Sequence, residues 1–366
     1  MLNRNKLKLS PLSSRHNRLS VESDSVSSDA QPSSLSASAS SVVDLTVERL
    51  RNARDKNCPR IMAFGAHSIK NGLGPLLGEL IRTGWVTHLA TNGAGVIHDW
   101  EFAYQGESSE DVKQNIVRGS FGIWDETGYY INLALIVGAY QGLGYGESVG
   151  KFIAEGELDI PSDRELQTQA ESGINDFTQY RKAAAALDFL AAKKEMSLPT
   201  GKIEVFHPWR EYSIQKTAYQ EGVSFTAHPM FGHDIIYTHP LNQGASIGRT
   251  AERDFLCFAD SVSRIDEGVY LSIGSAVMSP MVFEKSFSMA QNLSLQTSGT
   301  SINNHTIVVV DLAESNWDWS RGEPPEDRPE YYMRYCKTFS RMGGDMNYAC
   351  ADNRDFLLAL AHRLIA

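Results

Sequence analysis

Long apolar runs and paired cysteines are both missing from this chain of 366 residues. The apolar stretch 131–139 is interrupted by Asn132 and has about half the length that a membrane-spanning helix needs. The four cysteines, at positions 58, 257, 336 and 350, form no CxxC pair, so neither a zinc site nor a disulfide framework is predicted. We therefore expect a cytoplasmic protein without a membrane partner.

Positive charge is also scarce. The formal net charge is −10, whereas a chain that binds nucleic acid shows a basic face. The same acidity is compatible with a cationic substrate. Neither GxGxxG nor GxxxxGK[ST] occurs, so no nucleotide site can be assigned by motif alone. What the chain does have is 42% hydrophobic residues, enough to bury a sizeable core.

The first 55 residues differ in composition from the rest. Serine dominates residues 10–41, and such a segment buries too little apolar surface to offset its chain entropy. We expect residues 1–55 to be a disordered tail that ends in a short lead-in helix over 42–54. The first 18 residues are basic and contain no acid; they are either an ordinary basic start or a segment similar to an organelle transit peptide.

From residue 60 onward, short apolar runs alternate with segments of helical spacing. The runs predicted as strands are 60–64, 86–90, 224–227, 268–273 and 305–311. The segments predicted as helices are 71–83, 108–118, 126–142, 177–194, 280–295 and 353–365. This alternation predicts an α/β fold with a largely parallel sheet and helices on both faces. We expect residues 56–366 to form a single domain.

Three of the predicted strands end in small or acidic residues. The second runs into Thr91-Asn92-Gly93-Ala94-Gly95, the fourth into Gly274-Ser275-Ala276, and the fifth ends at Asp311. Ligands of parallel sheets bind at the carboxyl ends of the strands, and small residues let the backbone approach a pyrophosphate. Each segment could equally be an ordinary turn.

Histidines gather in the segment 226–240, together with one acid. The segment contains His228, His233, Asp234 and His239. Prolines and a glycine interrupt it, so the spacing fits no helical metal motif. We expect these side chains to line a pocket and no metal to bind. His67 and His98 follow the first two predicted strands, either as site residues or as structural histidines.

Lys337 lies among three tyrosines, at positions 331, 332 and 335. An amine that aromatic rings desolvate has a lowered pKa and can act as a nucleophile that forms an imine. The alternative is a surface lysine whose stem stacks on tyrosine. Acids at positions 323, 326, 327 and 330 could hold a polyamine or form a solvated loop.

Four stretches between residues 60 and 365 resemble the deoxyhypusine synthase family, and more closely its prokaryotic branch. GAHSIKNGL (65–73) stands at the family's first cofactor loop, and LATNGAGVIHDWE (89–101) at its second. YLSIGSAVMSPMVFEKSFSMAQNL (270–293) resembles the glycine-rich strand end before a helix. RPEYYMRYCKT (328–338), followed by Ala351-Asp352, resembles the segment with the catalytic lysine, two residues after an aromatic.

The resemblance implies an NAD-binding fold, assembled as a homotetramer, in which NAD takes a hydride from a polyamine such as spermidine. An aminobutyl group then passes as an imine to the catalytic lysine and on to an acceptor amine. The acceptor is a protein lysine in the name-giving enzyme, which forms a hypusine precursor, and a small diamine in its relatives. The resemblance therefore implies an amine or polyamine substrate and leaves an acceptor protein open as a partner.

The resemblance and the strand ends together assign roles to residues. The catalytic residue would be Lys337. The cofactor residues would be His67, Asn92, Gly93, Ala94, Gly95, Asp99, Gly274, Ser275, Asp311 and Asp352. The substrate residues would be His98, Asp234, Glu330 and Tyr335. Two other functions stay open, since a fold does not fix function: an NAD-dependent oxidoreductase or hydrolase without a transfer step, and an NAD-binding module without turnover.

Overall fold

The chain divides into two compact units in the computed structural model, which describes residues 2–365. Unit 1 comprises the residues up to Ser23, Val96–Gln220 and Pro229–Asp254. Unit 2 comprises Asp24–Gly95, Glu221–His228 and the residues from Phe255 on. Each unit includes some of the first 55 residues. The stretch 56–366, which was expected to form one domain, contributes residues to both units.

Unit 2 is built on a six-stranded parallel sheet in the order β10-β9-β8-β2-β3-β7. Its strands are β2 (Arg60–Phe64), β3 (His88–Thr91), β7 (Ser224–Ala227), β8 (Val269–Ile273), β9 (Thr306–Asp311) and β10 (Asp345–Cys350). Counted along the chain, the six strands lie in the order 3-2-1-4-5-6 across the sheet, so the order reverses between β2 and β8. The predicted α/β fold with a parallel sheet is confirmed.

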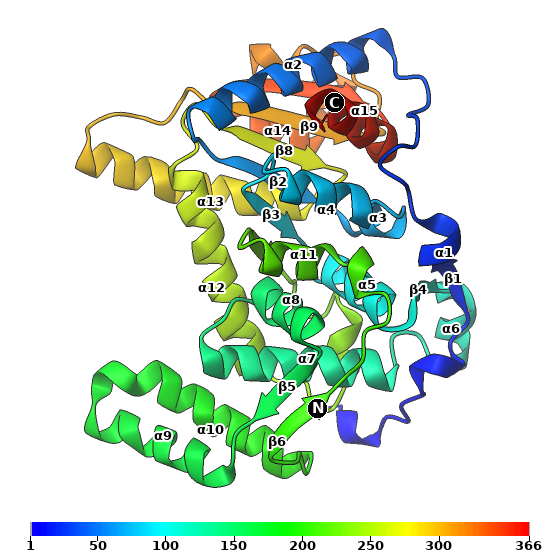
Figure 1. The fold of residues 1–366 in the computed structure, drawn as a ribbon. Helices are drawn as coiled ribbons and strands as arrows, with labels where there is room; N and C mark the ends of the chain where they lie inside the picture. Colours follow the sequence, from blue (N-terminus) through cyan, green and yellow to red (C-terminus); the bar gives the residue numbers. More distant parts are fainter. Residues whose placement is uncertain (1, 366) are drawn as a thin grey trace. The chain divides into compact units, whose positions relative to one another are not determined.

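Helices cover both faces of this sheet, which explains why β2, β3 and β8 are buried at every residue and read as continuous apolar runs. On one face, three phenylalanines pack around Tyr270. They come from α12 (Gly244–Ser263), α13 (Met278–Thr297) and α14 (Arg334–Ser340). On the other face, α2 (Ala37–Asp55) contacts β2, β8, β9 and β10, and α15 (Asn353–Ile365) lies beside α2 (Figure 1). Unit 2 also contains α3 (Ala66–Lys70) and α4 (Gly74–Arg82).

Unit 1 is mainly helical. Its helices are α6 (Val112–Arg118), α7 (Asp125–Gln141), α8 (Tyr145–Glu155), α9 (Asp163–Asn175), α10 (Tyr180–Glu195) and α11 (Ile214–Gln220). Two small antiparallel sheets pair β1 (Asn17–Ser20) with β4 (Glu107–Glu110) and β5 (Glu157–Ile160) with β6 (Gly201–Glu204). Three helices run through the division between the units: α1 (Val21–Asp24), α5 (Gly93–Gln105) and α12. The main segment of unit 1 is thus an insertion between β3 and β7 of the sheet.

The first 55 residues differ from the disordered tail that was predicted. Arg15 is buried, and its guanidinium donates to both carboxylate oxygens of Glu101, at 2.8 and 2.6 Å. Arg4 donates to the carbonyl of Tyr237 and to Asn242. Helix α2, capped by Ser36, begins five residues before the predicted lead-in helix. Composition misled because a few apolar residues, such as Leu12, Val43 and Leu50, are buried in the core, and charged side chains such as Arg15 add long-range pairs.

Three further details differ from the sequence-based expectations. Strand β10 was not predicted, because its sequence DMNYAC mixes polar and apolar residues at the edge of the sheet. The helix predicted over 108–118 begins at Val112, after an Asp111 cap, while Ser108 belongs to β4. Gly93-Ala94-Gly95 is the first turn of α5 rather than a loop. Among the helices of residues 2–365, none combines the length and the apolar character that crossing a membrane requires.

Candidate functional site

The carboxyl ends of the six parallel strands form one edge of the sheet in unit 2. Helices α3, α5, α13 and α15 begin within a few residues of the ends of β2, β3, β8 and β10. The first-turn N–H groups of such helices and the positive end of the helix dipole favour anionic ligands. In open parallel sheets the ligand binds at this edge, where the strand order reverses. The candidate site is therefore centred on β2 and β8, and we refer to it as the carboxyl-edge site.

At the reversal of strand order, two glycines hold the backbones of neighbouring loops unusually close. Gly65 follows β2 and Gly274 follows β8. The Gly65 N–H donates to the carbonyl of Ile273 at 3.1 Å, and a Cβ atom built on Gly65 would lie 2.3 Å from the Gly274 carbonyl oxygen. Gly274 has a φ of +55°, and a Cβ atom there would lie 2.2 Å from Nδ2 of Asn353. Only glycine fits both positions without displacing a neighbour.

The turn after β3 is fixed by its own side chains. The Oδ1 atom of Asn92 accepts the Gly95 N–H at 2.9 Å, which caps the start of α5. The Thr91 hydroxyl donates to the carbonyl of Phe64 at 3.0 Å and so ties the end of β3 to the end of β2. A Cβ atom on Gly95 would lie 2.2 Å from Thr91 Oγ1. The predicted segment 92–95 thus joins the carboxyl-edge site next to Gly65.

The remaining predicted cofactor residues of unit 2 also lie at or beside strand ends. Ser275 is buried, and its hydroxyl accepts the N–H of Ser279 in α13. Asp311 ends β9, and the Ala351 N–H donates to its carbonyl. Asp352 accepts the N–H of Arg354 and caps α15. His67 is exposed on α3, two residues after Gly65. These positions lie on or beside α3, α13, β9 and α15, which are labelled in Figure 1 and are far apart in the sequence.

Lys337 lies on α14, and its amine contacts Tyr331 and Glu323. Tyr335, two residues earlier on the same helix, lies within electrostatic range of Asp311, and helix residues two apart do not share a face. The Lys337 amine instead lies 3.3 Å from the ring centroid of Tyr331 and 3.0 Å from a carboxylate oxygen of Glu323. The contacts to Tyr331 and Glu323 raise the pKa of Lys337. Of the two interpretations of Lys337, these contacts favour a charged amine on tyrosine over an amine with a lowered pKa.

Glu330, predicted as a substrate residue, is buried in the loop before α14. One of its carboxylate oxygens accepts the Asn316 N–H at 3.0 Å, and the other lies 3.5 Å from the Arg328 guanidinium. Tyr335 is half-buried, and burial raises the pKa of its phenol. These contacts give Glu330 a role in anchoring the loop.

The other three predicted site residues belong to unit 1. Asp99 is buried and accepts hydrogen bonds from Ser213, Ile214 and Gln215 at the start of α11. Burial raises the pKa of this carboxyl despite those bonds. Asp99 therefore caps a helix rather than joining the segments that follow β2, β3 and β8 in unit 2.

His98 and Asp234 also have defined surroundings in unit 1. His98 shares a hydrogen bond of 2.7 Å with Ser108, whose hydroxyl donates to Glu101. Burial raises the pKa of Asp234 to about 6, against smaller opposite effects of His233 and Tyr237. The structure thus places the histidine in the buried network around Glu101.

The histidine cluster of the sequence is divided between the units. His228 follows β7 and is the last residue of the middle segment of unit 2, while His233 and His239 belong to unit 1. His228 is buried, and its N–H donates to the carbonyl of Thr91 at 2.8 Å. It therefore belongs to the carboxyl-edge site, which sequence spacing alone did not reveal. Among the described residues, no group of three or more histidine, cysteine or acidic side chains could hold a metal ion.

Two GxSxG stretches occur in the chain, at 146–150 and 244–248. Ser148 lies within α8 and donates to the Gly144 carbonyl, and Ser246 lies in the first turn of α12 and bonds to Gln243. A serine nucleophile of this motif sits on a sharp turn between a strand and a helix. Neither serine has that setting, so neither indicates a hydrolase.

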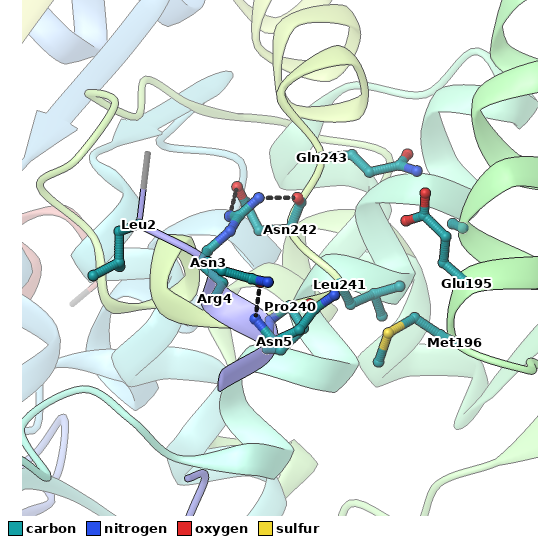
Figure 2. A pocket seen from close by; sticks show the side chains of 11 residues that line it. Leu2, Asn3, Arg4, Asn5, Glu195, Met196, Pro240, Leu241, Asn242 and Gln243 are labelled. Atoms are coloured by element: carbon teal, nitrogen blue, oxygen red, sulfur yellow. Dashed lines mark hydrogen bonds between the residues drawn. The ribbon is translucent and has the colours of Figure 1, made fainter. Parts of the chain in front are cut away.

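Unit 1 also contains a pocket of about 360 Å³ (Figure 2). Residues 2–5 line one side, and Glu195, Met196 and 240–243 line the other. Arg4 is held there by Asn242 at 2.8 Å. The guanidinium of this arginine donates to Tyr237 and Asn242, so its donors are used within unit 1.

No protein-family model and no curated protein sequence matches this chain. Solved structures of similar fold include AgrE in a ternary complex with ornithine and NAD⁺, with a TM-score of 0.44 and 14% identity over 91% of this chain and 34% of that one. A conserved putative LOR/SDH protein from Methanococcus maripaludis S2 has a TM-score of 0.45 and 13% identity, over 92% of this chain and 73% of that one. A putative deoxyhypusine synthase from Entamoeba histolytica has a TM-score of 0.42 and 9% identity, over 89% and 88%. The chain thus spans about a third of the AgrE chain.

Proposed function

We propose that this chain binds NAD at the carboxyl-edge site and uses it to oxidise an amine. The observation that carries the proposal is the strand order 3-2-1-4-5-6, with Gly65 and Gly274 on either side of its reversal. This order and this position are those at which doubly wound sheets bind dinucleotides.

The residues of the site suit a dinucleotide. The loops after β2 and β8 approach so closely that a Cβ atom on Gly65 would meet backbone, and glycines of this kind let a pyrophosphate approach the main chain. Gly93 and Ala94 supply first-turn N–H groups of the 13-residue helix α5, where a phosphate is favoured. Bound there, NAD would supply a hydride acceptor.

Carboxylates at the neighbouring strand ends support a cationic substrate. Asp311 ends β9, and Asp352 follows β10, the next strand in the sheet. Two carboxylates at one edge attract an ammonium group and could also accept hydrogen bonds from ribose hydroxyls. Asp311 and Asp352 would thus serve the amine or the cofactor.

Transfer of an aminobutyl group through Lys337 is the finer proposal, and the resemblance to the deoxyhypusine synthase family supports it. Such a step needs a neutral amine, whereas Glu323 and Tyr331 hold this one as a cation. Transfer therefore requires that the lysine leave these two partners. Amine oxidation without transfer needs no such movement of Lys337. A binding module without turnover needs neither a neutral Lys337 amine nor its movement.

A thermal-shift titration with NAD⁺, with and without spermidine or putrescine, tests the cofactor. A ligand that binds only the folded state raises the melting temperature. We expect NAD⁺ to raise it in the parent chain and in Gly84→Ala, but not in Gly274→Ala. Both glycines have positive φ, and only Gly84 has no heavy atom within 4 Å of the added Cβ. No shift in the parent chain at saturating NAD⁺ would refute the proposal.

Borohydride reduction in the presence of NAD⁺ and labelled spermidine separates transfer from plain oxidation. Transfer predicts a label on the parent protein that is lost in Lys337→Arg, while NAD⁺ still raises the melting temperature of the variant. Reduction of NAD⁺ without any protein label would support the oxidoreductase. Binding of NAD⁺ with neither label nor reduction by these amines would favour the non-catalytic module.

A further inference from the structure

A row of four buried polar side chains runs through unit 2 from α12 to the carboxyl edge of the sheet. The Ser261 hydroxyl lies 2.8 Å from Nδ1 of His88, and Nε2 of His88 lies 2.9 Å from the Thr226 hydroxyl. That hydroxyl in turn lies 3.1 Å from Nε2 of His228. Relative exposures along the row are 9%, 0%, 1% and 8%, from Ser261 to His228. The row is thus continuous in hydrogen bonds and meets the surface only at its two ends.

The surroundings of the row are apolar. The Phe258 ring packs edge-on against both imidazoles, at centroid distances of 5.4 Å for His88 and 5.2 Å for His228. Burial lowers the pKa of each histidine to about 3, with a further effect of His228 and Arg264 on His88. Both rings are therefore neutral at pH 7, and each carries one ring proton.

The hydrogen bonds restrict where those protons lie. Thr226 has a single hydroxyl proton, so it can donate to only one of the two facing Nε2 atoms. If it donates to one ring and accepts from the other, one histidine is protonated at Nε2 and the other at Nδ1. If the donor and the acceptor of every hydrogen bond in the row are exchanged, the two histidines exchange tautomers. The Nδ1 atom of His228 then changes from donor to acceptor. No charged imidazole is needed for the exchange.

We propose that His228, Thr226, His88 and Ser261 form a proton relay that takes a proton from a substrate at the carboxyl-edge site. The inference rests on the proposed amine oxidation, in which R–CH₂–NH₂⁺–R′ must lose a proton before its hydride leaves to NAD⁺ and R–CH=NH⁺–R′ forms. Nε2 of His228 faces Thr226, so the substrate proton enters the ring at Nδ1. His228 is thus the catalytic residue, and the other three act through it.

The proton balance closes along the row. As Nδ1 of His228 takes the substrate proton, its Nε2 proton passes to Thr226, and the Thr226 proton passes to Nε2 of His88. The Nδ1 proton of His88 passes to Ser261, whose own proton leaves to solvent. One proton enters and one leaves, and each side chain ends neutral.

The first test reads the tautomers in the protein alone. Imidazole nitrogen NMR at pH 7, assigned with His88→Gln and His228→Gln, should show two neutral rings of opposite tautomer. Two Nε2–H rings would mean that Thr226 accepts from both, and this result would overturn the relay. A charged ring at pH 7 would overturn it as well. Because this test uses no cofactor, its outcome does not depend on whether NAD⁺ binds.

The second test removes the middle of the row. With NAD⁺ and spermidine or putrescine, Thr226→Val should lower the rate of NAD⁺ reduction by about 100-fold, as expected for loss of acid–base catalysis. Thr226→Ser should retain the rate. Thr46→Val is the matched control, since Thr46 is a buried threonine of unit 2 that bonds only to the Val42 carbonyl of its own helix. All three variants should keep the NAD⁺ melting shift; equal rates in Thr226→Val and Thr46→Val would refute the relay.

Discussion

The carbonyl oxygen of Gly274 lies 2.3 Å from where a Cβ atom of Gly65 would stand. Gly65→Ala therefore forces the loops after β2 and β8 apart. We expect a loss of about 1–3 kcal/mol of stability, typical of overpacking, and a clear fall in NAD⁺ affinity by calorimetry. Gly248→Ala is the control, because an added Cβ meets no heavy atom within 4 Å there. Unchanged NAD⁺ affinity in Gly65→Ala would argue against the carboxyl-edge site.

Asp99 offers a test that separates a structural role from a cofactor role. Its carboxylate accepts hydrogen bonds from Ser213, Ile214 and Gln215. Asp99→Ala leaves those buried donors unsatisfied, which costs about 1–3 kcal/mol for each such group. Denaturant unfolding should register that loss, while NAD⁺ affinity at a temperature where the variant is folded should stay unchanged. A loss of NAD⁺ binding without a loss of stability would instead support the predicted cofactor role of Asp99.

The Arg15–Glu101 pair predicts how acid affects unit 1. Burial favours the neutral form of Glu101, but Arg15 and its hydrogen bonds hold the carboxyl pKa below its ordinary value. A depressed pKa contributes stability that is present above the ordinary pKa of about 4.5 and is lost as pH falls below it. Unfolding measured between pH 7 and pH 3 should therefore show a loss of stability below about pH 4.5.

Replacing Arg15 should reverse that dependence. Arg15→Met leaves a buried carboxylate unpaired, which costs about 3–5 kcal/mol, and burial then raises the pKa of Glu101, so that stability falls as pH rises. Arg18→Met is the control: Arg18 pairs with Asp111 at the surface, with 58% of its side chain exposed, where ion pairs contribute about 0–1 kcal/mol. Equal effects of the two substitutions would contradict this account.

Lys337 should be a slow nucleophile in the resting protein. Tyr331 and Glu323 raise its pKa, so a smaller fraction of the amine is neutral at pH 8 than for an ordinary lysine. Competitive labelling with an amine-reactive reagent, read by mass spectrometry, should find it less reactive than exposed lysines. Glu323→Gln should increase the labelling rate, and Glu326→Gln should not. Fast labelling of the parent protein would show that Lys337 leaves its partners readily.

The fold was predictable from the sequence because parallel strands buried on both faces carry a local signal. Residues 60–64 and 224–227 were predicted with the bounds of β2 and β7. Strand β10 was missed because it borders the sheet and carries polar residues. The attachment of residues 2–20 was missed because it depends on pairs distant in sequence, such as Arg15 with Glu101. No local pattern encodes such a partner.

The site was predictable only in part, for a similar reason. Small residues after strands marked Gly93 and Gly274, which do lie at the carboxyl edge. The surroundings of Lys337 stayed open in the sequence, because neighbouring tyrosines suggest desolvation, while Glu323, across a loop, supplies a negative charge. The sequence marked His228 only as one of several histidines in a segment. Its hydrogen bond to Thr226 depends on the position of β7 in the sheet, which the sequence does not show.

The insertion between β3 and β7 begins and ends at one spot on the sheet. The chain leaves after Thr91 and is back at His228, whose N–H donates to the Thr91 carbonyl at 2.8 Å. With respect to the sheet, the whole insertion is a single loop whose two ends are joined by this hydrogen bond. The entropy of closing a loop grows only with the logarithm of its length, so a long excursion costs the sheet little more than a short crossover. Large gains or losses of sequence in this loop are therefore compatible with an unchanged strand order.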